Sequence, residues 1–175
     1  MDILVEATGD RTRGTVTWGR RRAECALGRS GIAAIKKEGD GATPVGRFAL
    51  RRLFYRPDRT TRPETALPIQ PITPHLGWCD DPRSLAYNRL VRLPCPWRHE
   101  VLTRADGLYD LMVVLGHNDA PPQPGAGSAI FLHVATADYA PTEGCVALAM
   151  VDLVDLLRAA GPGDEMIIKG RRRRA

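Results

Sequence analysis

One histidine and one cysteine in the last third of the chain have the residue types and surroundings of an acyl-transfer site. His133 lies near the end of the apolar run 129–134, and Cys145 follows Gly144 twelve residues later. A thiol becomes a nucleophile when a neighbouring imidazole takes its proton, and a preceding glycine leaves backbone N–H groups accessible to a developing oxyanion. The alternative is inert packing, because single cysteines are often buried and single histidines often make structural hydrogen bonds.

The segments around this pair resemble the catalytic signature of the YkuD-type L,D-transpeptidases. Residues 142–145, Thr-Glu-Gly-Cys, stand where that family has Ser/Thr-His-Gly-Cys after a histidine-bearing strand. Residues 43–48, Thr-Pro-Val-Gly-Arg-Phe, resemble the family's early Thr-Pro-x-Gly-x-Phe turn. The resemblance spans roughly residues 3–169. It implies a mainly β, mixed sandwich or barrel-like single domain with one or two short helices.

The same resemblance implies a role for each matching residue. Cys145 would be the nucleophile, His133 the general base and acid, and the backbone N–H groups of Gly144 and Cys145 the oxyanion donors. The implied reaction cross-links peptidoglycan stem peptides through a cysteine thioester that an acceptor amine resolves. Neither a metal nor an organic cofactor is implied.

Two positions depart from the family pattern. Glu143 replaces the usual histidine, and Ala147 replaces an arginine or asparagine that would offer a polar or cationic partner to a substrate carboxylate. A carboxylate facing the thiol would raise the thiol's pKa, so we expect Glu143 to point away or to pair with an arginine. These departures and the short spacing from His133 to Cys145 resemble a divergent branch of short proteobacterial members.

Some members of that branch are associated with links from L-Ala to diaminopimelate, the 1,3 type, rather than with 3,3 links. Two other functions stay open. The same machinery with water as acceptor would make a peptidoglycan peptidase or amidase, and a non-catalytic domain would bind a wall polymer.

Four residues are further candidates for substrate binding. Thr142 and Glu143 adjoin the thiol, whereas Asn118 precedes a proline-rich loop and Tyr87 lies in a proline-rich segment. Asn118 followed by Asp is equally good turn chemistry, and Tyr87 equally fits loop packing. His117 is the alternative base, since it also lies near the motif in sequence.

Hydrophobic patterning predicts short strands joined by turns, with one helix near the end of the chain. The expected strands are 3–7, 15–18, 21–27, 32–36, 46–50, 100–103, 109–115, 129–134, 145–148 and 164–169. Residues 51–96 hold eight of the fourteen prolines, so we expect an irregular insertion there, with a turn at 77–82. Apolar spacing predicts a helix at 150–160 that stops at Gly161-Pro162.

Length and charge limit the function classes. A chain of 175 residues with 43% hydrophobic and 26% charged residues is typical of one folded domain, here 1–170, followed by a basic tail at 171–175. The net charge of +5 comes mostly from Arg171–Arg174, so the body is nearly neutral and nucleic acid is not an expected partner. We interpret the tail as solvated, with weak polyanion contact as the alternative.

Compartment and cysteine usage give weaker signals. No apolar run approaches the ~18 residues of a membrane-spanning helix, and the N-terminus shows no signal peptide. The implied substrate nevertheless favours the periplasm, with the cytoplasm left open. Four cysteines at wide spacings exclude a disulfide scaffold and suggest no zinc site, although a Cys79–Cys95 bond stays open in an oxidising compartment.

Overall fold

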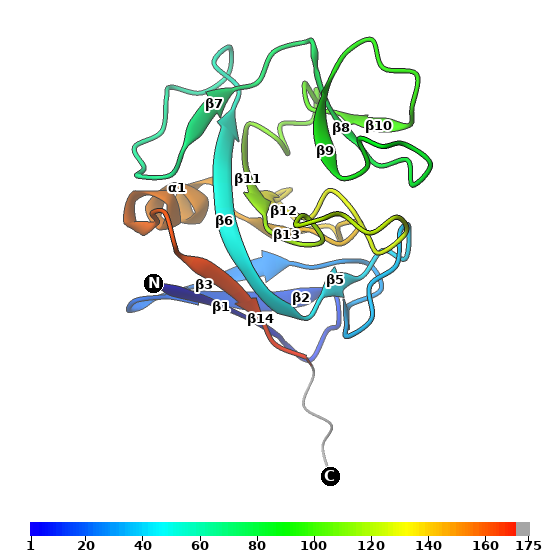
Figure 1. Ribbon diagram of the computed structural model, residues 1–175. Coiled ribbons are helices and arrows are strands. Elements are labelled where there is room, and N and C mark those ends of the chain that lie inside the picture. The colour runs from blue at the N-terminus through cyan, green and yellow to red at the C-terminus, as the bar shows by residue number, and fades with distance from the viewer. Residues whose placement is uncertain (171–175) are drawn as a thin grey trace.

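The computed structural model describes residues 1–170. Strands make up 38% of it, and one helix packs beside the strands (Figure 1). The strands of the main sheet are β1 (Asp2–Ala7), β2 (Arg13–Trp18), β3 (Arg21–Ala26), β6 (Gly46–Tyr55), β7 (Ile69–Pro71), β11 (Leu111–Leu115), β12 (Phe131–Val134), β13 (Val146–Leu148) and β14 (Glu165–Ile168). A smaller three-stranded sheet contains β8 (Leu76–Cys79), β9 (Arg89–Arg92) and β10 (His99–Val101). The short strands β4 (Ile32–Ala33) and β5 (Thr43–Pro44) pair in parallel.

The main sheet closes on itself. Its strand order is β11-β12-β13-β3-β2-β1-β14-β6-β7, and an additional antiparallel pairing of β11 with β6 joins the two ends. All of these strands except β7 therefore form a ring, which leaves no open edge between them. The predicted mainly β, barrel-like fold with one short helix is confirmed.

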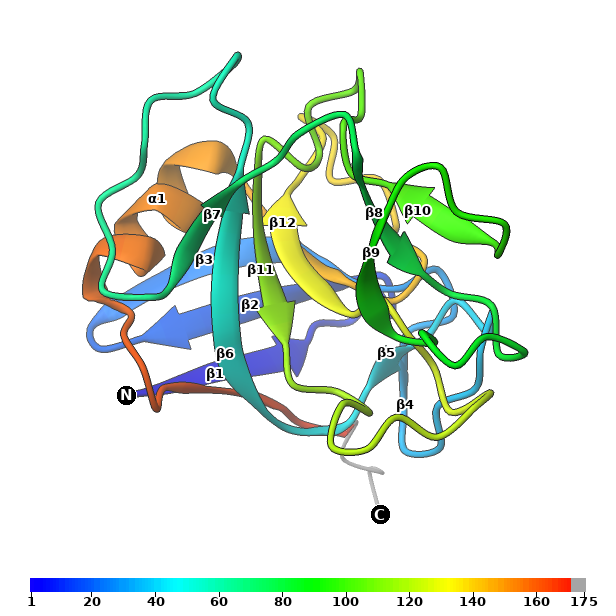
Figure 2. The ribbon, with the colours of Figure 1, turned by 45° about the horizontal axis from the view of Figure 1, so that its top comes forward.

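Strand β11 separates two hydrophobic cores because its alternate side chains point to opposite faces. Leu111, Val113 and Leu115 belong to the core inside the barrel. Met112 and Val114 belong to a second core, which lies between the barrel wall and the small sheet of β8, β9 and β10. Figure 2 shows this small sheet and the helix on opposite sides of β11 and β12. A strand covered on both faces explains the continuous apolar run 111–115.

Helix α1 (Met150–Ala159) contributes buried side chains to the same hydrophobic core as the barrel strands. Its three buried leucines, Leu153, Leu156 and Leu157, recur at the spacing of one helical face. The helix stops before Gly161-Pro162, because proline cannot continue a helix. The prediction of a helix over 150–160 is therefore confirmed.

The proline-rich segment 51–96 is more regular than expected. Strand β6 does not end at residue 50 but continues to Tyr55, because β11 pairs with its second half. The turn expected at 77–82 is wrong for its first residues, since Gly77, Trp78 and Cys79 lie in β8 between β9 and β10. The strand expected at 32–36 shrinks to the two residues of β4.

Several further observations bear on the sequence-based expectations. All four cysteines are free, including Cys79 and Cys95. Within residues 1–170, no helix has the length and apolar character to cross a membrane, and no group of side chains could hold a metal ion. The predicted basic tail, 171–175, lies outside the described residues.

Candidate active site

The parallel pairing of β12 with β13 places His133 and Cys145 on one face of the sheet. His133 lies opposite Ala147, and Leu132 lies opposite Val146. Since Leu132 and Val146 point into the barrel core, the alternating residues His133 and Cys145 point to the other face. The strand register therefore brings together two residues that are twelve positions apart.

The turn before the cysteine requires glycine. Gly144 has a φ of +134°, and a Cβ atom there would lie 2.7 Å from the backbone oxygen of Ala42. The Thr142 hydroxyl donates to the Cys145 carbonyl oxygen at 2.7 Å and accepts the Gly144 N–H at 3.1 Å. Thr142 thus fixes the turn, and its hydroxyl is occupied within it. The Gly144 N–H is also committed to this turn, whereas the Cys145 N–H, the second expected oxyanion donor, makes no hydrogen bond within residues 1–170.

The Cys145 thiol is buried and neutral. Its Sγ donates to the Ala129 carbonyl oxygen at 3.3 Å and accepts the Phe131 N–H at 3.3 Å. Burial raises the pKa of Cys145 to about 12, and the nearby charge of Glu100 acts in the same direction. Only a thiol that keeps its proton can donate to a carbonyl.

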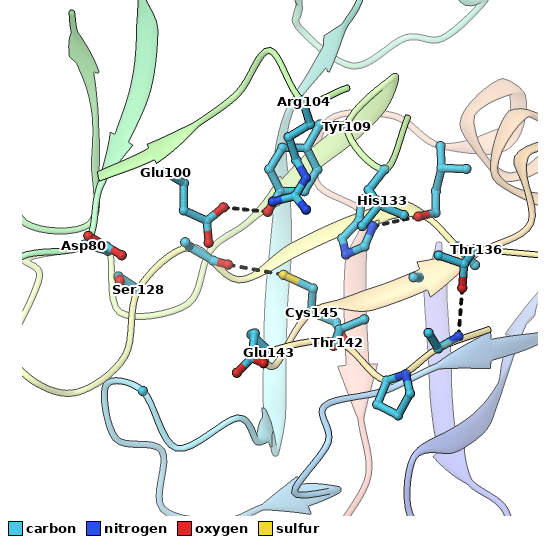
Figure 3. Close-up of a pocket in the computed structure, with 18 of the residues that line it drawn as sticks. Asp80, Glu100, Arg104, Tyr109, Ser128, His133, Thr136, Thr142, Glu143 and Cys145 are labelled. Atoms are coloured by element: carbon cyan, nitrogen blue, oxygen red, sulfur yellow. Dashed lines mark hydrogen bonds between the residues drawn. The ribbon is translucent and has the colours of Figure 1, made fainter. Parts of the chain in front are cut away.

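The His133 imidazole has a defined tautomer. Its Nδ1 lies 2.8 Å from the carbonyl oxygen of Val134, and because a carbonyl only accepts, Nδ1 carries the proton. The lone pair of Nε2 is then available to a second group. Burial lowers the pKa of His133 to about 4, so the ring is neutral at pH 7. Figure 3 shows the imidazole and the thiol facing the same cavity.

A cavity of about 510 Å³ opens over this pair, and its far wall comes from a distant part of the chain. That wall includes Asp80, Arg98, Glu100, Arg104 and Tyr109. The Tyr109 hydroxyl donates to Glu100 at 2.5 Å, and burial raises the pKa of Glu100. The Tyr109 ring meets the imidazole edge-on, with centroids 5.4 Å apart.

The half-buried carboxylate of Glu38 supports a third side of the cavity. The Glu38 carboxylate accepts hydrogen bonds from the hydroxyls of Ser128, at 2.7 Å, and Tyr87. Lys36 also lines the cavity, and its buried ammonium pairs with Asp40. These contacts fix the loop at 36–40 against the segment that leads into β12.

The model of one protein family, the YkuD L,D-transpeptidase catalytic domain, matches residues 4–168. The chain belongs to this family. A search of curated proteins and a search of solved structures found no match. Membership of the L,D-transpeptidase family implies a peptidoglycan substrate.

The remaining predicted site residues occupy different places in this L,D-transpeptidase domain. Glu143 lines the cavity and pairs with Arg29 at 2.8 Å, as the expectation of an arginine partner required. Tyr87 does not line the cavity, since its buried hydroxyl holds Glu38 from behind. Tyr87 therefore supports Glu38, and its contact with substrate stays a prediction.

Asn118 and His117 also lie away from the cavity. Asn118 has a φ of +48°, and its side-chain amide donates to the carbonyl oxygens of Gln123 and Gly127. This amide closes the proline-rich loop, and substrate binding by Asn118 stays a prediction. The His117 ring lies 3.1 Å from the Ala126 carbonyl oxygen and packs on Phe48, so it is not placed to act on the thiol.

The sequence-based search missed Glu38, Glu100, Arg104 and Tyr109 as residues of the L,D-transpeptidase cavity. Charged residues are common on any surface, and nothing local in the sequence marks these four. One signal was available. The expected strands 100–103 and 109–115 begin with an acidic and an aromatic residue, and such residues are candidates for the wall of a site.

Proposed function

We propose that the protein is a cysteine-dependent peptidoglycan L,D-transpeptidase in which Cys145 is the nucleophile. One observation carries the proposal: the Cys145 thiol shares a cavity with an imidazole whose Nδ1 proton is held by Val134, which leaves Nε2 to act as a base. A neutral imidazole with a free Nε2 in the same cavity as a thiol can serve as the general base.

The proposed reaction has two half-reactions. The Cys145 sulfur attacks the carbonyl carbon of a stem-peptide bond while His133 Nε2 takes the thiol proton. His133 then gives this proton to the leaving amine, and the peptide C–N bond breaks to leave a thioester. In the second half-reaction an acceptor amine attacks the thioester, His133 takes the amine proton, and the proton returns to the departing sulfur.

The turn before Cys145 supports the charge that develops during both attacks. The negative oxygen of the tetrahedral intermediate needs N–H donors at the nucleophile. We assign this role to the Cys145 N–H, because the Gly144 N–H is held by Thr142. Recruitment of Gly144 as a second donor would require the Thr142 hydroxyl to release it.

The donor residue is the finer part of the proposal. Ala147, opposite His133, is buried and carries no cation, so the carboxylate partner usual at this position is missing. Together with the resemblance to the short proteobacterial branch, this supports L-Ala as the acyl donor and diaminopimelate as the acceptor, a 1,3 link. Because the proposed substrate belongs to the cell wall, we propose the periplasm as the compartment of the reaction.

Mass spectrometry of purified muropeptides incubated with the protein tests this function. We expect dimers joined from L-Ala to diaminopimelate with the wild type and with Cys25→Ala, and none with Cys145→Ala. Cys25 is a matched control, because it is also buried and burial raises its pKa to about 12, yet it lies in the barrel core.

Each other outcome contradicts a specific part of the proposal. Dimers joined only between diaminopimelate residues would overturn the 1,3 link. Cleaved monomers without dimers, even with excess acceptor amine, would indicate a peptidase that uses water. Dimers from folded Cys145→Ala would exclude Cys145 as the nucleophile.

A further inference from the structure

We propose that Arg104 binds a free carboxylate of the donor peptide. This carboxylate belongs to the leaving residue, whose nitrogen forms the peptide bond that Cys145 breaks. This inference rests on the proposed function and adds a residue that determines which substrates are accepted. Arg104 follows β10, in the loop that forms the far wall of the cavity. No local sequence pattern connects it with Cys145.

Among residues 1–170, three cationic side chains line the cavity, and two of them are held by neighbouring groups. Lys36 is buried against Asp40 and also donates to the Lys37 carbonyl oxygen at 2.9 Å. Arg98 donates to the Asp80 carboxylate at 3.0 Å and to the Asp80 carbonyl oxygen at 2.5 Å. Lys36 therefore acts as a structural support. Arg98 also keeps a free Nη1 within residues 1–170, but Asp80 holds its Nε and Nη2, and Glu38 lies 4.0 Å from the same Nη2.

Arg104 retains free donors. Its Nε and Nη2 donate to Asp106, with Nε at 3.0 and 3.1 Å from the two carboxylate oxygens, whereas Nη1 makes no hydrogen bond within residues 1–170. The side chains of this ion pair are 39% and 45% exposed, and exposed ion pairs contribute little to stability. A ligand carboxylate can therefore bind Nη1 or replace Asp106 at small cost.

Packing holds the guanidinium close to the reacting pair. It lies over the Tyr109 ring, 5.1 Å from the centroid, and the same ring packs against His133. Figure 3 shows Arg104 and Tyr109 side by side at the edge of the cavity that His133 and Cys145 face. The positive charge of Arg104 acts on both groups, since it favours neutral His133 and ionised Cys145.

The acidic groups in the same cavity do not cancel this site. The Glu100 carboxyl accepts a hydrogen bond from the Tyr109 hydroxyl at 2.5 Å, and Asp80 is held by Arg98. Glu143 lines the cavity, but its carboxylate pairs with Arg29, which lies outside the lining. Of the cations that line the cavity within residues 1–170, Arg104 is the one that packs, through the Tyr109 ring, against His133.

The position of Arg104 selects a class of donor. An amino acid that is linked onward through its side chain keeps its α-carboxylate free, on the carbon next to the scissile nitrogen. A guanidinium beside the catalytic pair can receive this carboxylate while the carbonyl carbon lies at the sulfur. The preferred donor is therefore a peptide bond whose leaving amine carries an α-carboxylate, and the α-carboxamide is the disfavoured analogue.

Alkylation of Cys145 by two small probes tests the site without any peptide substrate. Iodoacetate and iodoacetamide differ only in the carboxylate, and the rate at Cys145 is read by peptide mass spectrometry. We expect Arg104→Gln to lower the ratio of the iodoacetate rate to the iodoacetamide rate about tenfold. Arg104→Lys should give a smaller drop, since it keeps the charge and loses the planar fork.

Arg83→Gln is the control for losing one cation, because Arg83 pairs with Asp81 and does not line the cavity. Its ratio should stay within about twofold of the wild type. An unchanged ratio in Arg104→Gln, an equal drop in Arg83→Gln, or a larger drop in Arg98→Gln would overturn the assignment.

Substrate kinetics then connect the site with the reaction. Wild-type protein should prefer a muropeptide with the α-carboxylate on the leaving residue over its α-carboxamide, and Arg104→Gln should lose this preference mainly through KM. If the wild type transfers neither muropeptide, the proposed function fails while the alkylation ratio still decides the role of Arg104. Wild-type turnover that ignores the amidation would contradict the inference.

Discussion

The resting state of Cys145 gives the most direct test of the site. The perturbation is pH, and the readout is the rate at which iodoacetamide alkylates Cys145, followed by peptide mass spectrometry. Because alkylation requires the thiolate, the rate reports the ionised fraction of this one thiol. Peptide mapping is needed, since the half-buried Cys95 reacts in the same reagent.

The structure sets the magnitude. A thiol with a pKa of about 12 is ionised in about one molecule in 10⁵ at pH 7, and the ionised fraction rises tenfold with each pH unit. An unperturbed cysteine with a pKa of about 8.5 is ionised to about 3% at pH 7 and levels off above pH 9. We therefore expect the Cys145 rate to climb about tenfold per unit from pH 6 to pH 9, with no plateau.

A plateau already at pH 6, or a rise between pH 4 and pH 6 that follows His133, would refute this reasoning. Either profile would mean that the proton has moved from Cys145 to His133 before substrate binds. In the structure the Ala129 carbonyl oxygen accepts the thiol proton, and burial disfavours both charged forms. Proton transfer to His133 is thus expected only once substrate enters the cavity.

Three further variants test the packing around the site. Gly144→Ala should lower the free energy of unfolding by about 2 kcal/mol or more, because its Cβ would lie 2.7 Å from a backbone oxygen. The control Gly125→Ala, also at positive φ but in open space, should lose about 1 kcal/mol. Equal losses in urea titrations of the two variants would contradict this. Burial lowers the pKa of His133 from 6.5 to about 4, so between pH 6.5 and pH 4 this histidine is protonated in the unfolded chain and neutral in the folded one. The free energy of unfolding of the wild type should therefore fall by about 3 kcal/mol as the pH drops from 6.5 to 4. His133→Gln should remove this part of the pH dependence. Tyr87→Phe should cost about 1 kcal/mol through its lost hydrogen bond. Tyr55→Phe, whose hydroxyl makes no hydrogen bond within residues 1–170, should change the melting temperature little.

The sequence alone determined the features that depend on short-range pattern. Apolar alternation located most strands, the spacing of the buried leucines located α1, and the Thr-Glu-Gly-Cys segment with its upstream histidine identified the family that the match over 4–168 confirms. These features can be predicted from the sequence because each depends on a local pattern of about ten residues. The patterns are the periodicity of a strand or a helix and a turn that only glycine can form. The pairing of Glu143 with an arginine was foreseen as well, although its partner, Arg29, was not.

The tertiary structure decided what long-range pairing controls. Strands β8 and β9 form inside a proline-rich segment because they pair with each other, and β8 also with β10, a gain that no local propensity reveals. The same pairing brings Glu100, Arg104 and Tyr109 over a cysteine about forty residues away. The hydrogen bonds of Tyr87 and Asn118 show the same dependence on long-range contacts. A polar side chain binds either a ligand or the protein's own backbone and side chains, and the folded neighbours decide which groups it can reach.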